Sequence, residues 1–186
     1  MEALLLSLLT VGLAEIGDRS QIMVLLLAAR FRRPLPVFGG LLAASVLGHG
    51  VSAAIGVSLG HLIDPQIVHW LVAGILIIMG AWLLLHPGIQ VRHRPAPRSG
   101  LGAFGTSFIA ITLMELGDKS QLATLALSAH FGTWLPVATG AVLAVMLINA
   151  PVVWLGHRFG RNLPLNAIRV IAGIVLILLG SWIGLN

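Results

Sequence analysis

Two short acidic motifs hold the side chains of this sequence that are best suited to chemistry. Residues 15–21 are Glu-Ile-Gly-Asp-Arg-Ser-Gln, and residues 115–121 are Glu-Leu-Gly-Asp-Lys-Ser-Gln, one hundred positions later. Together the two motifs contain four of the six Asp and Glu residues of the chain. Carboxylate and other side-chain oxygens are the ligands that hard divalent cations prefer. The motifs therefore predict a binding site for a divalent metal ion.

The predicted ligands occupy equivalent positions in the two motifs. A Glu and an Asp three positions apart share one face of a continuous α-helix, so each motif would direct two carboxylates to one point. The Ser and Gln that follow would add further oxygens to the cluster. The predicted metal ligands are Glu15, Asp18, Ser20, Gln21, Glu115, Asp118, Ser120 and Gln121.

The charges of the motifs predict coupling to protons. The four carboxylates carry a charge of −4 and the basic residues Arg19 and Lys119 carry +2, which leaves −2. One divalent ion or two protons would neutralise this remainder, and crowded carboxylates release protons when a cation arrives. Ion pairs of Glu15 with Arg19 and of Glu115 with Lys119 are the structural alternative. They would explain two of the four acids and leave the excess negative charge unexplained.

The composition indicates a membrane protein. Of the 186 residues, 58% are hydrophobic and only 9% are charged, and the mean hydropathy is +1.00. A soluble domain needs roughly a quarter of its residues charged, so the outer surface must face lipid. The absence of cysteine excludes disulfides and thiolate metal sites. We expect no cleavable signal peptide, because the first residues lack the basic segment that such a signal needs.

Six apolar stretches are long enough to cross a hydrocarbon core of about 30 Å as helices. They lie near residues 3–29, 35–60, 67–86, 101–129, 134–157 and 164–185. Glu15 and Glu115 would then lie near the middle of the first and fourth spans. A carboxylate at that depth costs at least about 2.5–3.5 kcal/mol, so acidic residues there indicate a function.

The basic residues predict how the spans are oriented. Nine of the eleven Lys and Arg residues fall in or beside the loops that follow the first, third and fifth spans. They are Arg30, Arg32, Arg33, Arg92, Arg94, Arg98, Arg158, Arg161 and Arg169. By the positive-inside rule these loops are cytoplasmic, and both termini face outward. The positive charge is thus an orientation signal, which argues against binding to nucleic acid.

The chain also repeats itself beyond the two motifs. The offset of one hundred residues continues through several matched pairs. These are Phe31/Phe131, Pro36/Pro136, Gly40/Gly140, Gly56/Gly156, Gly60/Gly160, Gly80/Gly180 and Trp82/Trp182. We predict an all-α membrane protein of six transmembrane helices, with repeat 1 at 1–86, a cytoplasmic linker at 87–100 and repeat 2 at 101–186. Because each repeat has an odd number of spans, the second is inverted relative to the first, as in many secondary transporters.

The pattern Glu-x-Gly-Asp-(Lys/Arg)-Ser, present twice in a six-span chain, resembles that of the GDT-type cation exchanger family. That family includes eukaryotic Golgi manganese and calcium transporters and short bacterial manganese exporters. The resemblance covers nearly the whole chain, and its cation-binding acids match Glu15, Asp18, Glu115 and Asp118. It implies proton-coupled efflux of Mn²⁺, with a Ca²⁺/H⁺ antiporter as the alternative. The compact length and short central loop resemble the bacterial members, so the resemblance implies the bacterial inner membrane.

Other polar residues leave alternatives open. His49 and Asn149 occupy matching mid-span positions, where they could line the ion path or form hydrogen bonds between helices. Met114 precedes Glu115, and its thioether would favour Mn²⁺ if it reached the ion; otherwise it only packs. The remaining histidines fall at span edges or in loops, where we expect interfacial positions and no zinc site. They are His61, His69, His86, His93, His130 and His157.

Three other classes of function compete with an exchanger. The first is a channel, or an exporter of small organic cations, although no aromatic residue lies within the motifs. The second is an intramembrane enzyme, although the chain has no HExxH motif and the repeat suits transport better. The third is a non-catalytic assembly subunit, although no soluble docking domain is visible. We expect a divalent metal ion and membrane lipid as partners, no resident cofactor and no enzymatic activity, and leave a homodimer open.

Overall fold

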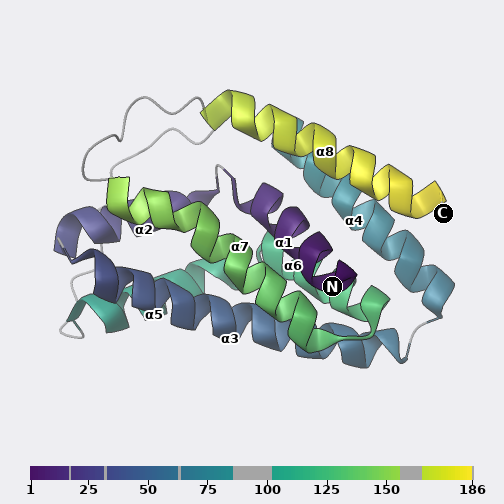
Figure 1. Ribbon diagram of the computed structural model, residues 1–186, viewed down its shortest axis with the longest axis horizontal. Coiled ribbons are helices and arrows are strands. Elements are labelled where there is room, and N and C mark those ends of the chain that lie inside the picture. The colour runs from purple at the N-terminus through teal and green to yellow at the C-terminus, as the bar shows by residue number, and fades with distance from the viewer. Residues whose placement is uncertain (17, 32, 63, 86–101, 156–164, 186) are drawn as a thin grey trace.

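The computed structural model describes residues 1–16, 18–31, 33–62, 64–85, 102–155 and 165–185. In these residues the regular structure is entirely helical, which confirms the all-α prediction for this part of the chain (Figure 1). The helices are α1 (Glu2–Glu15), α2 (Arg19–Phe31), α3 (Pro34–Gly60), α4 (Pro65–Leu85), α5 (Gly102–Glu115), α6 (Lys119–Phe131), α7 (Trp134–Leu155) and α8 (Leu165–Leu185). The predicted linker 87–100, with its arginines, lies outside the described residues. So do Arg32, Arg158, Arg161, His86, His93 and His157.

Four of the predicted spans are single helices, namely α3, α4, α7 and α8. The other two are each divided into a pair of short helices, α1 with α2 and α5 with α6. The prediction of one continuous helix over 3–29 and another over 101–129 is therefore wrong. Both divisions fall inside an acidic motif, because Glu15 and Glu115 are the last residues of α1 and α5.

The surface and the interior have the polarity expected of a protein in lipid. The helices Pro34–Gly60 and Trp134–Trp154 are long and apolar enough to cross a membrane. Large apolar side chains cover the outer faces of the long helices, including Val46, Val51 and Ile55 on α3. Hydroxyl groups lie inside instead, for example those of Ser7, Thr10, Ser45, Ser107 and Thr124. Apolar residues outside and polar residues inside are typical of a helical membrane protein.

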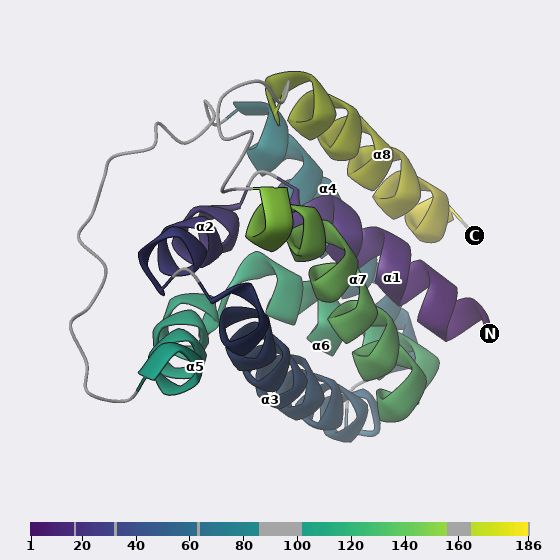
Figure 2. The same ribbon diagram turned by 60° about the vertical axis from the view of Figure 1, so that its left-hand side comes forward.

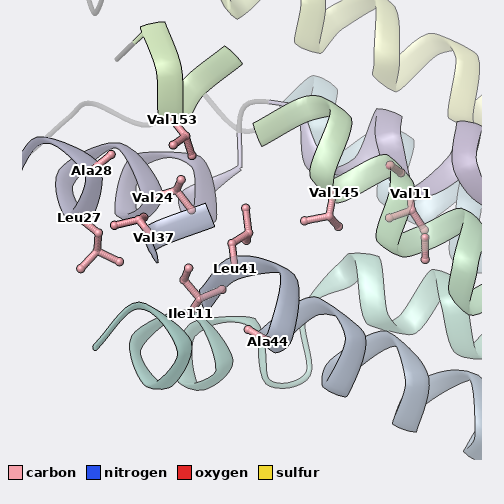
Figure 3. Packing of buried hydrophobic residues seen from close by; sticks show 12 residues of the cluster. Val11, Val24, Leu27, Ala28, Val37, Leu41, Ala44, Ile111, Val145 and Val153 are labelled. Carbon is pink, nitrogen blue, oxygen red and sulfur yellow. The ribbon is translucent and has the colours of Figure 1, made fainter. Parts of the chain in front are cut away.

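Helices of each half of the chain pack against helices of the other half. Helix α3 packs on α5 of the second half, and α7 packs on α1 of the first half, as the two views in Figures 1 and 2 agree. A cluster of buried apolar side chains unites α1, α2, α3, α5 and α7, including Val11, Val24, Leu41, Ile111 and Val145 (Figure 3). Each half therefore relies on the other to bury its apolar surface.

Matched glycines set the close approach of these helices. A Cβ atom on Gly40 would lie 2.7 Å from the Phe104 carbonyl oxygen and 2.9 Å from the Phe108 nitrogen. A Cβ atom on Gly140 would likewise collide with the Leu4 carbonyl oxygen. The two contacts are one hundred residues apart on both sides, so equivalent residues make them. Gly80 and Gly180 repeat this relation between α4 and α8.

We expect a leucine at Gly40 or Gly140 to destabilise the protein strongly. Overpacking a tight interior costs about 1–3 kcal/mol, and here the new side chain meets rigid backbone of another helix. Gly50→Leu on the same helix α3 is the matched control, because nothing lies within 4 Å of a Cβ atom at that position. Thermal unfolding in detergent measures the effect. Equal melting temperatures for Gly40→Leu and Gly50→Leu would show that the α3–α5 approach is not tight.

Candidate functional site

Each acidic motif ends one helix and starts the next. After Glu15 the backbone of Ile16 is extended, with φ −63° and ψ 120°. In the second motif Gly117 has φ +72°, in the left-handed region that favours glycine. Asp118 then caps α6, because its carboxylate accepts a hydrogen bond of 3.4 Å from the Ser120 backbone nitrogen. The Gly-Asp pair is thus a helix stop followed by a helix start.

This break corrects the predicted geometry of the carboxylates. The Glu and the Asp of one motif lie on two different helices, so they do not share one helix face. The turn between them is closed by backbone hydrogen bonds, from Asp18 to Glu15 at 3.1 Å and from Asp118 to Glu115 at 3.0 Å. Discontinuous helices of this kind expose backbone groups and side chains at a substrate site in many transporters.

The two glutamates are deeply buried. Glu15 is fully buried and Glu115 is 3% exposed. The Ser20 hydroxyl donates a 3.1 Å hydrogen bond to Oε2 of Glu15. Within the part of the chain that the structure describes, Oε1 of Glu15 and both carboxyl oxygens of Glu115 have no hydrogen-bond partner. Buried polar atoms without a partner are costly, so these oxygens are available to a cation or a proton.

The two motifs meet through an ion pair between the repeats. The Lys119 ammonium group contacts Oδ1 of Asp18, and both side chains are partly buried. The alternative pair of Lys119 with Glu115 is therefore not the one formed. The side chain of Arg19 lies outside the described residues. One cation of the second motif thus neutralises one acid of the first.

The four acidic residues of the two motifs lie in one region of the bundle. Glu115 lies within electrostatic range of Glu15, Asp18 and Asp118, and Glu15 within range of both aspartates. Among the described residues, however, no three His, Asp or Glu side chains converge closely enough to hold a metal ion. The proposed ligands are therefore neighbours around a shared region rather than a closed coordination shell. Their role as metal ligands stays a prediction.

The other predicted ligands support the helix breaks. The Ser120 hydroxyl donates to the Asp118 carboxylate at 3.3 Å. Oε1 of Gln121 accepts a 3.2 Å hydrogen bond from the Gly117 nitrogen. The amide of Gln121 also packs so closely on α3 that a Cβ atom on Gly48 would collide with it. Gln21 is partly buried at the matching position of α2.

His49 and Asn149 are both fully buried but bond differently. Nδ1 of His49 lies 2.9 Å from Oγ1 of Thr124 on α6, which confirms a hydrogen bond between helices. The Thr124 hydroxyl donates onward to the Ser120 carbonyl at 2.9 Å. Asn149 instead donates to the Val145 carbonyl of its own helix at 3.0 Å.

Thr124 is the residue that sequence reasoning missed. The matching position of the first repeat is Val24, so the hydroxyl is absent there. The repeats also differ at the partner position, which is histidine at 49 and asparagine at 149. These two differences between the repeats were the signal available in the sequence. Met114 is 36% exposed, so its side chain reaches the surface of the bundle; its role as a metal ligand stays a prediction.

Comparison with known proteins identifies the family. The family described as "Divalent cation/proton antiporter GDT1" matches residues 3–89 and 103–186. The chain belongs to this family. As a GDT1 family member it is a membrane transporter of divalent cations and not an enzyme, which confirms the predicted class. The enzyme and assembly-subunit alternatives are thereby set aside.

Several relatives resemble this GDT1 family member over nearly all of its length. A Vibrio cholerae protein named "Putative manganese exporter" is 36% identical over 180 residues, which cover 96% of this chain and 88% of the relative. The GDT1-like protein sll0615 of Synechocystis is 24% identical over 201 residues, covering 94% of both chains. GDT1-like protein 3 of Oryza sativa is 27% identical over 199 residues, covering 95% of this chain and 71% of the relative. No solved structure matches the chain.

Proposed function

We propose that this GDT1 family member exports Mn²⁺ across the bacterial inner membrane in exchange for protons. The observation that supports this most is the pair of buried glutamates, Glu15 and Glu115, whose free carboxyl oxygens lie at two helix breaks. The Vibrio cholerae relative with the name "Putative manganese exporter" supports the choice of ion and direction. Ca²⁺/H⁺ exchange is the second candidate, because an all-oxygen site also suits Ca²⁺.

In the proposed mechanism the acidic side chains bind the ion and the protons in turn. A divalent ion entering the region displaces Lys119 from Asp18 and gains oxygens from both glutamates. On release of the ion, two protons restore the neutrality of the site, since the net motif charge is −2. Because either the ion or the protons must be bound to neutralise the site, the two fluxes are coupled.

The proposed arrangement in the membrane has six spans, with α1–α2 and α5–α6 each crossing as one broken helix. The two three-span repeats are inverted, the linker 87–100 is cytoplasmic, and both termini face outward. Equivalent glycine contacts at Gly40 and Gly140 support a two-fold relation between the repeats. An inverted relation makes the inward-open and outward-open states mirror one another in their contacts.

Flux through purified protein in liposomes tests the exchange. With the higher proton concentration on the side toward which Mn²⁺ is carried, we expect Mn²⁺ to move against its own concentration gradient. A pH-sensitive dye should report protons moving in the opposite direction. Clamping both pH and voltage should then abolish uphill Mn²⁺ movement. Undiminished Mn²⁺ flux with no proton movement would refute proton exchange and favour a channel. The same assay with Ca²⁺ in place of Mn²⁺ decides between the two candidate substrates.

A further inference from the structure

A second cluster of possible metal ligands lies far along the bundle from the acidic motifs. It lines a cavity of about 770 Å³ at the end of the bundle where Figure 1 marks both termini. The end of α3, the start of α4, the end of α6 and the end of α8 form its walls. Three histidines, His61, His69 and His130, are among its lining residues. None of them belongs to the proposed Mn²⁺ site.

Two of these histidines lie next to one another on two different helices. The ring centroids of His69 on α4 and His130 on α6 are 6.1 Å apart, and the rings are tilted by 47°. Two imidazoles that share a tetrahedral zinc ion, with Zn–N bonds of about 2.0–2.1 Å, have centroids roughly 5 Å apart. The two rings therefore need to approach by about 1 Å. Rotation of the exposed His130 side chain can supply this movement.

Neutral imidazole is the form of histidine that binds a metal ion. The Glu2 carboxylate lies within electrostatic range of His130. The other described titratable groups nearby are His61 at the end of α3 and Asp64, whose carboxylate accepts a 2.8 Å hydrogen bond from the Gln66 nitrogen. No Lys or Arg lies between residues 34 and 91 or between 120 and 157. Lys and Arg side chains therefore do not oppose a cation at this end, where the N-terminal ammonium group of Met1 also lies (Figure 1).

The ligand type selects a different metal from the acidic site. Imidazole nitrogens suit Zn²⁺, Cu²⁺ and Ni²⁺, whereas Mn²⁺, Ca²⁺ and Mg²⁺ prefer carboxylate, carbonyl and water oxygens. No third His, Asp or Glu in the described residues comes close enough to complete a three-ligand site. A metal bound here would therefore keep water in its remaining positions and exchange readily.

From these observations we propose that His69 and His130 form a two-histidine site for a borderline transition-metal ion such as Zn²⁺, and that the bound ion ties α4 to α6. This part of the inference rests on the proposed function. A metal ion bound between His69 and His130 would restrain α6, whose other end carries the second acidic motif. Zn²⁺ bound at this end would then slow Mn²⁺ transport without entering the Mn²⁺ site.

Zinc binding to the purified full-length protein tests the site directly. The background variant Glu15→Gln/Glu115→Gln removes binding at the acidic motifs, so that the remaining Zn²⁺ reports the histidines. We expect one Zn²⁺ per chain near neutral pH, loss of this ion in His69→Gln and in His130→Gln, and its retention in His61→Gln. Binding should also fall below about pH 6, as the imidazoles become protonated. Unchanged Zn²⁺ binding after removal of both histidines would overturn the proposal.

Two further measurements keep structure and transport apart. The natural chain contains no cysteine, so the double variant His69→Cys/His130→Cys should be crosslinked by a short thiol reagent if α4 and α6 are adjacent here. Zn²⁺ added on this side should inhibit Mn²⁺ flux at least about 10-fold less in His130→Gln than in the natural protein. If Zn²⁺ binds but does not inhibit Mn²⁺ flux, the proposed restraint on α6 is refuted and the two-histidine site is retained. If the natural protein shows no Mn²⁺ flux even without Zn²⁺, the proposed function is refuted instead.

Discussion

Replacing either Glu15 or Glu115 with glutamine is expected to reduce Mn²⁺ transport at least about 100-fold. Glutamine keeps the shape of the side chain and one oxygen but loses the negative charge. Removing one partner of a buried charged interaction typically costs about 3–5 kcal/mol, which corresponds to a loss of that size or greater. The initial rate of Mn²⁺ flux in liposomes measures the change. Because both glutamates serve one ion, the double variant should be no worse than either single variant.

The matched control for these variants is Glu2→Gln, which removes a carboxylate from the exposed start of α1. It should transport Mn²⁺ at the natural rate. All variants should elute as the same folded species in detergent, since the glutamine side chain fills the same volume. If Glu15→Gln retains most of the flux while Glu115→Gln loses it, the first motif is structural and the shared site is wrong.

Replacing Lys119 is expected to change affinity and turnover in opposite directions. The Lys119 ammonium group contacts the Asp18 carboxylate, so it competes with an incoming cation for that carboxylate. In Lys119→Gln we therefore expect a lower KM for Mn²⁺, because the competitor is gone. We also expect turnover to fall by about 10-fold or more, because the ion-free site keeps an uncompensated negative charge that is costly to move through the protein. Flux measured over a range of Mn²⁺ concentrations separates the two effects.

Lys119→Arg is the conservative control, because arginine retains the positive charge and can still pair with a carboxylate. It should keep much of the turnover. A purely structural ion pair predicts a different result. In that case Lys119→Gln would lower the melting temperature and the yield of folded protein, but the KM of the remaining protein would stay the same.

The sequence predicted the family of the chain but not the geometry of its two motifs. Buried acids repeated at a fixed offset indicated the family, and the family match confirmed it. The helix breaks were also encoded, since Gly117 and Asp118 are ordinary residues for a helix end and a helix cap. They were missed because the apolar residues on both sides form one long stretch by hydropathy. Local cap signals prevailed over the length of the apolar run.

Contacts between distant segments had no local signal. The Lys119–Asp18 pair joins residues 101 positions apart, whereas helical spacing suggested partners four positions apart within each motif. Similarly, the packing of α1 on α7 and of α3 on α5 makes the halves interdependent, which sequence spacing alone does not specify. The repeated glycines at positions 40 and 140 were visible in the sequence, but only the fold shows which backbones they admit.

Equilibrium binding of Mn²⁺ to the purified protein is the most direct test of whether the two motifs form a single site. If they do, the natural protein binds one Mn²⁺ per chain, and Glu15→Gln and Glu115→Gln each lose that ion. Two bound ions per chain, with each variant losing only one of them, would show two separate sites and contradict a shared one.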